Sequence, residues 1–179
     1  KAIIEENENR YRTFIEEAPF ATALYMGPEL NVTYANSLML DVLHKDTSII
    51  GKPLVKALPE IINYPYYDIL MHVYTTGQLY TGYQHDISDS KNPNLPRKFV
   101  NFQYKALMNK EGQIYGILHT AWDVTSEVLA NRLQEENQKN FRNMIMQAPI
   151  AIMILRGQDI LVELVNPVMI DLLNLKLTG

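Results

Sequence analysis

The residues His119–Phe141, HTAWDVTSEVLANRLQEENQKNF, join two kinds of secondary structure without a break. Apolar and polar residues alternate up to Trp122, which is the period of a β-strand. The next residues, Asp123-Val124-Thr125, run directly into a charged helical pattern, and no glycine or proline separates the two elements. The sequence therefore predicts a strand that continues into a helix through a three-residue junction.

The composition is that of an ordinary globular protein. The chain has 179 residues, of which 47% are hydrophobic and 20% are charged, and its formal net charge is −4. The negative charge and the lack of a Lys/Arg cluster argue against nucleic acid as a partner. The chain has no cysteine, which excludes disulfides, thiolate nucleophiles and Cys-ligated metals. No apolar run reaches the roughly 18 residues of a membrane span, and the N-terminus lacks the apolar segment of a signal peptide, so we expect a cytoplasmic location.

The start of the chain recurs near its end. Ile3–Leu43 aligns without a gap with Leu133–Leu173. The identical pairs include Asn7 and Asn137, Pro19 and Pro149, Asn36 and Asn166, and Asp41 and Asp171. A repeat of this length predicts one complete module followed by the opening of a second.

The pattern within the first module predicts strands and helices in a fixed order. Strands are expected at 20–26 and 30–36 around the turn Gly27-Pro28, and Asn36 is expected to cap the helix that follows. The remaining elements are short helices at 37–44, 54–60 and 64–77 and strands at 78–88, 98–108 and 113–124. This order predicts an α+β fold, with a five-stranded antiparallel sheet and all helices between the second and third strands. The helices must then cover one sheet face and leave the other for a partner.

Several segments in this order resemble the PAS sensor domains of bacterial signalling proteins. They are EEAPFATALYM, NVTYANSLMLDVL, IIGKPLVKALPE, TTGQLYTGY and NKEGQIYGILHTAWDVTSE, the last containing the family's terminal Asp-hydrophobic-Thr signature. The resemblance covers about Arg10–Glu127 and resumes from Phe141. It implies a PAS fold flanked by N- and C-terminal linker helices, in a tandem arrangement. The expected divisions are a linker helix at 1–18, a complete PAS domain at 19–126, a linker helix at 127–147 and the start of a second, truncated PAS domain at 148–179.

The resemblance also implies a function in signalling. We expect a sensory or dimerisation module of a multi-domain protein, a sensor histidine kinase whose catalytic domains lie beyond Gly179. A ligand-free relay module, and a regulatory domain of a cyclic-dinucleotide synthase or phosphodiesterase, are the alternatives. No phosphate-binding glycine-rich loop or nucleophile-base spacing is present, so no catalytic residue is expected within this chain.

The junction between strand and helix is expected to carry the signal. Thr125 can cap the helix through its hydroxyl, and Asp123 can accept hydrogen bonds from nearby backbone amides. By family resemblance, the junction passes a change in the sheet to the linker helix and onward to an effector. The alternative is that these residues only cap the helix.

The linker helix carries Leu133, Asn137 and Met144 at spacings of 4 and 7 residues. A polar Asn in an apolar seam sets the register of coiled coils, which predicts a homodimer through the linker helices. The uncovered sheet face is a second candidate for the dimer contact. Alternatively, the linker residues pack on that face of their own module.

A pocket between the sheet and the helices is the expected ligand site. By resemblance to flavin-binding relatives, His119 and Ala121 point into it, while Trp122 points away. The full set of candidate ligand contacts is Tyr67, Met71, Tyr83, Asn101, Gln103, His119 and Ala121. A small-molecule ligand would meet Asn101, Gln103 and His119 as polar groups in an apolar cavity. Alternatively, these three side chains hydrogen-bond one another in an empty core.

The cofactor, if one is bound, cannot be identified from the sequence. The lack of cysteine excludes a flavin-cysteine adduct. His72 lies on the predicted helix at 64–77, where haem-binding PAS domains carry their proximal histidine, so it is a haem candidate. No metal site is predicted.

Overall fold

The computed structural model describes residues 13, 15–88 and 96–173. The chain divides into two compact units, Lys1–Thr125 and Ser126–Gly179. Most of the linker helix expected at 1–18 lies outside the described residues. Within the described part, no helix combines the length and apolar character needed to cross a membrane.

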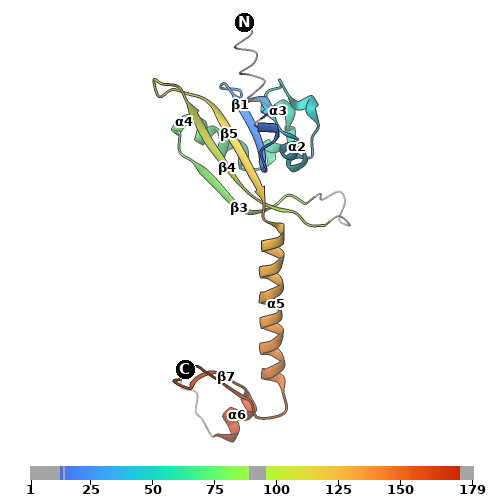
Figure 1. The fold of residues 1–179 in the computed structure, drawn as a ribbon, viewed down its shortest axis with the longest axis vertical. Helices are drawn as coiled ribbons and strands as arrows, with labels where there is room; N and C mark the ends of the chain where they lie inside the picture. Colours follow the sequence, from blue (N-terminus) through green and yellow to red (C-terminus); the bar gives the residue numbers. More distant parts are fainter. Residues whose placement is uncertain (1–12, 14, 89–95, 174–179) are drawn as a thin grey trace. The chain divides into compact units, whose positions relative to one another are not determined.

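The first unit is built on a five-stranded antiparallel sheet (Figure 1). Its strands are β1 (Ala21–Met26), β2 (Asn31–Ala35), β3 (Tyr80–Asp86), β4 (Phe99–Met108) and β5 (Ile114–Asp123). Their spatial order is β2-β1-β5-β4-β3, and every neighbouring pair is antiparallel. The sheet confirms the fold class predicted from the sequence.

Five helical segments of the first unit lie between β2 and β3, as expected, and the described residues Thr13, Ile15 and Glu16 before β1 are also helical. They are α2 (Ser37–Leu43), η1 (Thr47–Ile49), α3 (Leu54–Ala57), η2 (Pro59–Asn63) and α4 (Tyr66–Thr76). Helix α4 ends where Gly77 adopts a left-handed conformation, with φ of +75°, which glycine reaches without steric cost. Three of the segments are the predicted helices, and the two 3₁₀ turns connect them.

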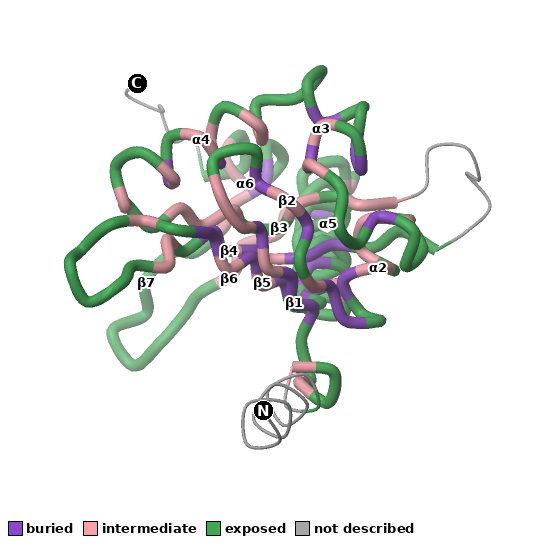
Figure 2. The backbone as a smooth tube through the Cα atoms, turned by 90° about the horizontal axis from the view of Figure 1, so that it is seen from above, coloured by how far each residue is buried: buried purple, intermediate pink, exposed green. Residues whose placement is uncertain are grey.

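The core of the first unit lies between the helices and one face of the sheet. Helix α2 packs on β1, α3 on β2, and α4 on β4 and β5. Alternate residues of the central strands are buried there, and Figure 2 shows the buried stretches around β1, β4 and β5. The strand residues of this face are Ala21, Ala23, Tyr25, Val100, Phe102, Tyr104, Ile117, His119 and Ala121. Apolar burial on this one face holds the helices to the sheet.

Asn36 connects the chain before β1 to the start of α2. Its side-chain Oδ1 accepts hydrogen bonds from the backbone N–H groups of Thr22 and Met39, both at 2.9 Å. Its Nδ2 donates to the carbonyl oxygens of Ile15 at 3.1 Å and Phe20 at 3.0 Å. Asn36 is fully buried, so these four bonds replace the water that its amide loses on folding. The predicted helix cap is confirmed.

The second unit repeats this arrangement. Helix α5 (Thr125–Gln147) is followed by β6 (Met153–Arg156), β7 (Leu161–Val165) and α6 (Pro167–Leu172), and β6 and β7 form an antiparallel pair. Asn166 is fully buried at the position that corresponds to Asn36. It accepts from the backbone N–H groups of Ile152 and Met169, at 2.9 and 3.0 Å. It donates to the carbonyl oxygens of Ile145, Ala148 and Ile150. The sequence repeat therefore has a structural counterpart.

Candidate functional site

A cavity of about 350 Å³ lies between the inner sheet face and the helical segments of the first unit. Strands β4 and β5 supply one wall, with Val100, Phe102, Tyr104, His119 and Ala121. Residues 85–88 line the cavity as well, and the helical side supplies Val42, Leu43, His44, Leu58, Glu60, Ile61, Tyr64 and Tyr66. A mostly apolar cavity of this size with a few polar groups has the character of a small-molecule site.

The pairing of β4 with β5 decides which side chains enter the cavity. His119 is paired with Tyr104 and Ala121 with Phe102, and cross-strand partners project from the same face. His119 and Ala121 therefore line the cavity, as predicted. Trp122 projects from the other face and is 37% exposed.

The expectation that Asn101 and Gln103 enter the cavity is wrong. Asn101 is paired with Trp122 and Gln103 with Thr120, so both side chains lie on the outer face. The Oδ1 of Asn101 accepts a hydrogen bond from the backbone N–H of Gln84 at 2.7 Å. Alternation along β4 predicts which residues share a face, but it does not predict which of the two faces lines the cavity. The register of β4 against β5 decides this, and a shift of one residue exchanges the two faces.

Three other predicted contacts also lie away from the cavity lining. Tyr67 and Met71 are partly buried beside the core, because α4 turns Leu70 and Val73 toward the sheet instead. Tyr83 is 73% exposed.

His72 does not line the cavity either. It is an exposed residue of α4, and its Nε2 lies 3.4 Å from Oε1 of Gln78. A haem ligand must project into a cavity that holds the porphyrin. The position of His72 contradicts its assignment as the haem candidate.

His119 is a buried polar group of the cavity wall. Its Nδ1 lies 2.9 Å from the hydroxyl oxygen of Tyr25, and the two residues are 5% and 1% exposed. Burial lowers the pKa of His119 to about 3 and raises the pKa of Tyr25 above its ordinary value. The pair is therefore uncharged at neutral pH.

Sequence reasoning missed a second histidine in the cavity, His85. Its Nε2 lies 2.8 Å from the hydroxyl oxygen of Tyr66, and the two rings meet edge to face at 5.1 Å. Burial lowers the pKa of His85, and the neighbouring Asp86 carboxylate opposes this shift. The ladder is shifted between Gly82 and His85, and the φ of Gln84 is +50°, so simple alternation along β3 could not place His85.

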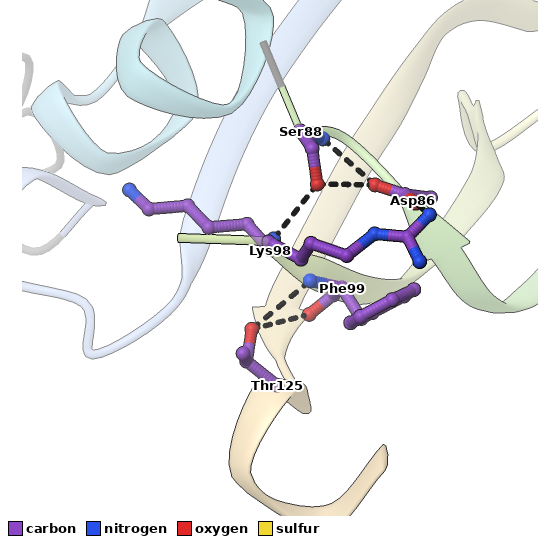
Figure 3. A network of polar contacts seen from close by, with 6 residues as sticks. Asp86, Ser88, Lys98, Phe99 and Thr125 are labelled. Atoms are coloured by element: carbon purple, nitrogen blue, oxygen red, sulfur yellow. Dashed lines mark hydrogen bonds and ion pairs between the residues drawn. The ribbon is translucent and has the colours of Figure 1, made fainter. Parts of the chain in front are cut away.

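Polar contacts hold the end of β3 to the start of β4 beside the cavity (Figure 3). Asp86 accepts hydrogen bonds from the backbone N–H and the hydroxyl of Ser88, and Arg97 forms an ion pair with it at 2.6 Å. The Ser88 hydroxyl oxygen accepts from the backbone N–H of Lys98 at 3.0 Å. Both Asp86 and Ser88 line the cavity. One edge of the cavity is thereby connected to Arg97 and Lys98, the two residues just before β4.

Phe99, the first residue of β4, is bonded to the junction with α5. Its backbone N–H donates to the Thr125 hydroxyl oxygen at 2.9 Å, and its carbonyl oxygen accepts from the same hydroxyl at 3.4 Å (Figure 3). The Phe99 carbonyl oxygen also accepts from the backbone N–H of Val124, at 2.9 Å. The expectation that the Thr125 hydroxyl caps the helix is wrong. The pairing of β5 with β4 places the backbone of Phe99 beside this hydroxyl, which bonds Phe99 instead. At the start of the helix, the Asp123 carboxylate accepts a hydrogen bond from the backbone N–H of Thr125 at 2.7 Å. Hydrogen bonding from the side chain and the backbone N–H of Thr125 lowers the pKa of Asp123.

Comparison with known proteins agrees with this architecture. Residues 9–74 match the family model of the PAS domain. No curated protein matches the chain by sequence. Many solved structures match it, among them the PAS domain of BvgS from Bordetella pertussis, with 15% identity and a TM-score of 0.53, over 75% of this chain and 98% of that one.

Two further matches come from larger proteins. An RNA-binding Light-Oxygen-Voltage receptor matches with 14% identity and a TM-score of 0.54, over 79% of this chain and 38% of the receptor. The VqmA dimer of Vibrio cholerae matches with 13% identity and a TM-score of 0.50, over 66% of this chain and 52% of VqmA. At these identities the structural matches establish only the fold. The first unit of this chain therefore has the PAS fold, and its residues 9–74 match the PAS family model.

Proposed function

We propose that the first unit senses a small molecule in the cavity between its sheet and its helices. The observation that carries this proposal is the cavity itself, about 350 Å³ with a mostly apolar lining and the uncharged His119 in its wall. Ligand sites in proteins combine these features. The first unit acts by binding, and catalysis belongs to another part of the protein.

We further propose that occupancy of the cavity is passed to α5 through Asp123 and Thr125. The cavity and the junction share two strands, because Phe102 and Ala121 form a pair only a few residues from Phe99 and Thr125. A ligand that separates β4 from the helical segments would pull on the Phe99–Thr125 bond. The helix begins at Thr125, so no loop lies between that bond and α5 to absorb the movement.

The parent protein in this proposal is a cytoplasmic sensor histidine kinase. The chain would supply a PAS domain at 19–126, a linker helix at 127–147 and the start of a second PAS domain at 148–179, with a homodimer formed through the linker helices or the outer sheet face. The sequence that follows Gly179 tests the assignment. A phosphoacceptor helix with ATP-binding motifs supports a kinase, and a nucleotide-cyclase or phosphodiesterase signature contradicts it.

Native mass spectrometry of the gently purified chain, with a denatured control, tests whether the cavity is used. We expect a non-covalent mass that is lost on denaturation. The change Ala121→Leu adds bulk inside the cavity and should abolish this mass. The matched control is Thr120→Leu on the opposite face of the same strand, which should retain it. Retention of the mass by Ala121→Leu would place the ligand elsewhere.

Hydrogen exchange of α5, compared between loaded and emptied protein, tests the relay. We expect the amides of the first turns of α5 to change their exchange rate when the cavity is filled. The response should be lost in Thr125→Val, which lacks the hydroxyl that accepts from the Phe99 N–H. A filled cavity with unchanged exchange in α5 would contradict the relay.

A further inference from the structure

Two polar atoms of the cavity wall, Nε2 of His119 and the hydroxyl oxygen of Tyr104, have no hydrogen-bond partner among the described residues. Both residues are only 5% exposed. Within the same part of the chain, every fully buried side-chain nitrogen or oxygen does have a partner. The two atoms must therefore contact open space, and for both residues that space is the cavity they line.

The hydrogen bond to Tyr25 decides which ring nitrogen of His119 carries the hydrogen. The Tyr25 hydroxyl is buried, and Nδ1 of His119 is its one acceptor within the described part of the chain, at 2.9 Å. A buried O–H group needs an acceptor, so Nδ1 accepts a hydrogen bond from the Tyr25 hydroxyl. The neutral imidazole then carries its own hydrogen on Nε2. His119 presents an N–H donor to the cavity.

The Tyr104 hydroxyl lies on the neighbouring ring. The rings of Tyr104 and His119 meet edge to face, with centroids 4.7 Å apart and an interplanar angle of 69°. A hydroxyl both donates and accepts, whereas the His119 N–H only donates. A ligand that satisfies both groups must carry a hydrogen-bond acceptor, and it gains a second bond if a donor lies beside that acceptor.

The charges around the cavity favour an uncharged ligand. No Lys or Arg is among the described residues that line it. The lining carboxylates of Asp86 and Glu60 already pair with Arg97 at 2.6 Å and Lys45 at 2.8 Å. An ionised ligand would lose its hydration without gaining a free counter-charge, which is costly.

The size and walls of the cavity favour a small ring. A volume of about 350 Å³ equals that of about 12 water molecules in the liquid, which leaves room for one or two rings. Tyr66, Phe102 and Tyr104 present aromatic surfaces to it, and such surfaces pack well against a planar partner.

Given the proposed sensing function, we infer that the ligand is a neutral, planar ring compound of the lactam type. Its carbonyl oxygen accepts from His119 Nε2–H, and its adjacent N–H group bonds the Tyr104 hydroxyl. Tyr104 and His119 determine which ligand is accepted, and the aromatic walls determine its shape.

Three single-ring probes test this inference on the 179-residue chain after removal of any copurified ligand. They are 2-pyridone, a neutral lactam, toluene, which has no polar group, and benzoate, an anion. We expect 2-pyridone to bind more tightly than toluene and to shift the ¹⁵N resonance of His119 Nε2, and benzoate not to bind. Tyr104→Phe should weaken 2-pyridone about two- to tenfold, the effect of one lost hydrogen bond, and leave toluene unchanged.

Tyr80→Phe is the matched control, because the Tyr80 ring stacks on Tyr104 but does not line the cavity. It should leave the affinity for every probe unchanged. The inference is overturned if benzoate binds as tightly as 2-pyridone, if toluene does, if Tyr104→Phe has no effect, or if no probe binds. A charged copurified ligand that alters α5 would overturn the inference and keep the sensing function. Binding of 2-pyridone as expected, with an unresponsive α5, would keep the inference and refute the relay.

Discussion

Acidification should destabilise the first unit in a pH range where few carboxylates titrate, because His119 must stay neutral to remain buried. Burial lowers the pKa of His119 from 6.5 to about 3. The unfolded chain therefore binds a proton below about pH 6.5 that the folded chain does not bind until about pH 3. The contribution of neutral His119 to the free energy of unfolding is complete above about pH 6.5 and is lost progressively as the pH falls toward 3.

The expected loss at pH 5 follows from these values. The pH lies about 1.5 units below the unfolded pKa, and each unit corresponds to about 1.36 kcal/mol, so the free energy of unfolding falls by about 2 kcal/mol. The pKa of His119 in the folded chain hardly affects this loss, because it lies well below 5. Burial also lowers the pKa of His85, which adds to the loss in the same direction. The pKa values of Asp86 and Asp123 are lowered, so their contribution is lost only at more acidic pH.

Urea unfolding at pH 7.5 and pH 5.0 measures this difference, with Trp122, the one tryptophan of the chain, as a fluorescent reporter in the first unit. His119→Gln removes the titrating group while its amide oxygen can still accept from Tyr25. His72→Gln is the control, because His72 is exposed. Wild type and His72→Gln should lose about 2 kcal/mol between the two pH values, and His119→Gln less than half as much. An equal loss in His119→Gln and wild type would refute the reasoning.

Three further substitutions test the packing around the site, each measured by urea unfolding of the first unit. Thr125→Val removes the hydroxyl that accepts from β4 and should cost about 1 kcal/mol, whereas Thr125→Ser should retain that stability. Asn36→Ala removes four hydrogen bonds of a buried side chain and should cost about 3 kcal/mol or more, while the corresponding Asn166→Ala should leave this transition unchanged. Gly82→Ala places a methyl group against the ring of Phe102 and should cost about 1–3 kcal/mol, so an unchanged midpoint would contradict that contact.

Local patterns predicted most of the fold. The period of two in the strands, the turn at Gly27 and the cap at Asn36 each act over a few residues, and the structure confirms them. The repeat was also visible in the sequence, and the structure gives Asn36 and Asn166 corresponding hydrogen-bond partners at sequence separations of 3, 14, 16 and 21 residues. The inward positions of His119 and Ala121 were predicted from family resemblance and agree with the cavity lining.

Other features depended on pairing between distant strands. The phase of β4 against β5 places Phe102 and Tyr104, rather than Asn101 and Gln103, in the cavity. The irregular pairing of β3 beyond Gly82 brings His85 into the cavity, although a regular alternation along the strand does not place it there.

The hydrogen-bond partner of the Thr125 hydroxyl also depends on pairing between distant strands. Its hydroxyl bonds Phe99, 26 residues earlier in the chain, because β4 and β5 are adjacent in the sheet. The sequence alone determined which residues form strands, turns and helix caps, since these depend on neighbours within a few positions. Only the tertiary structure decided which side chains face the cavity and the junction, because register is set by the burial of a whole face and a shift of one residue exchanges inside for outside.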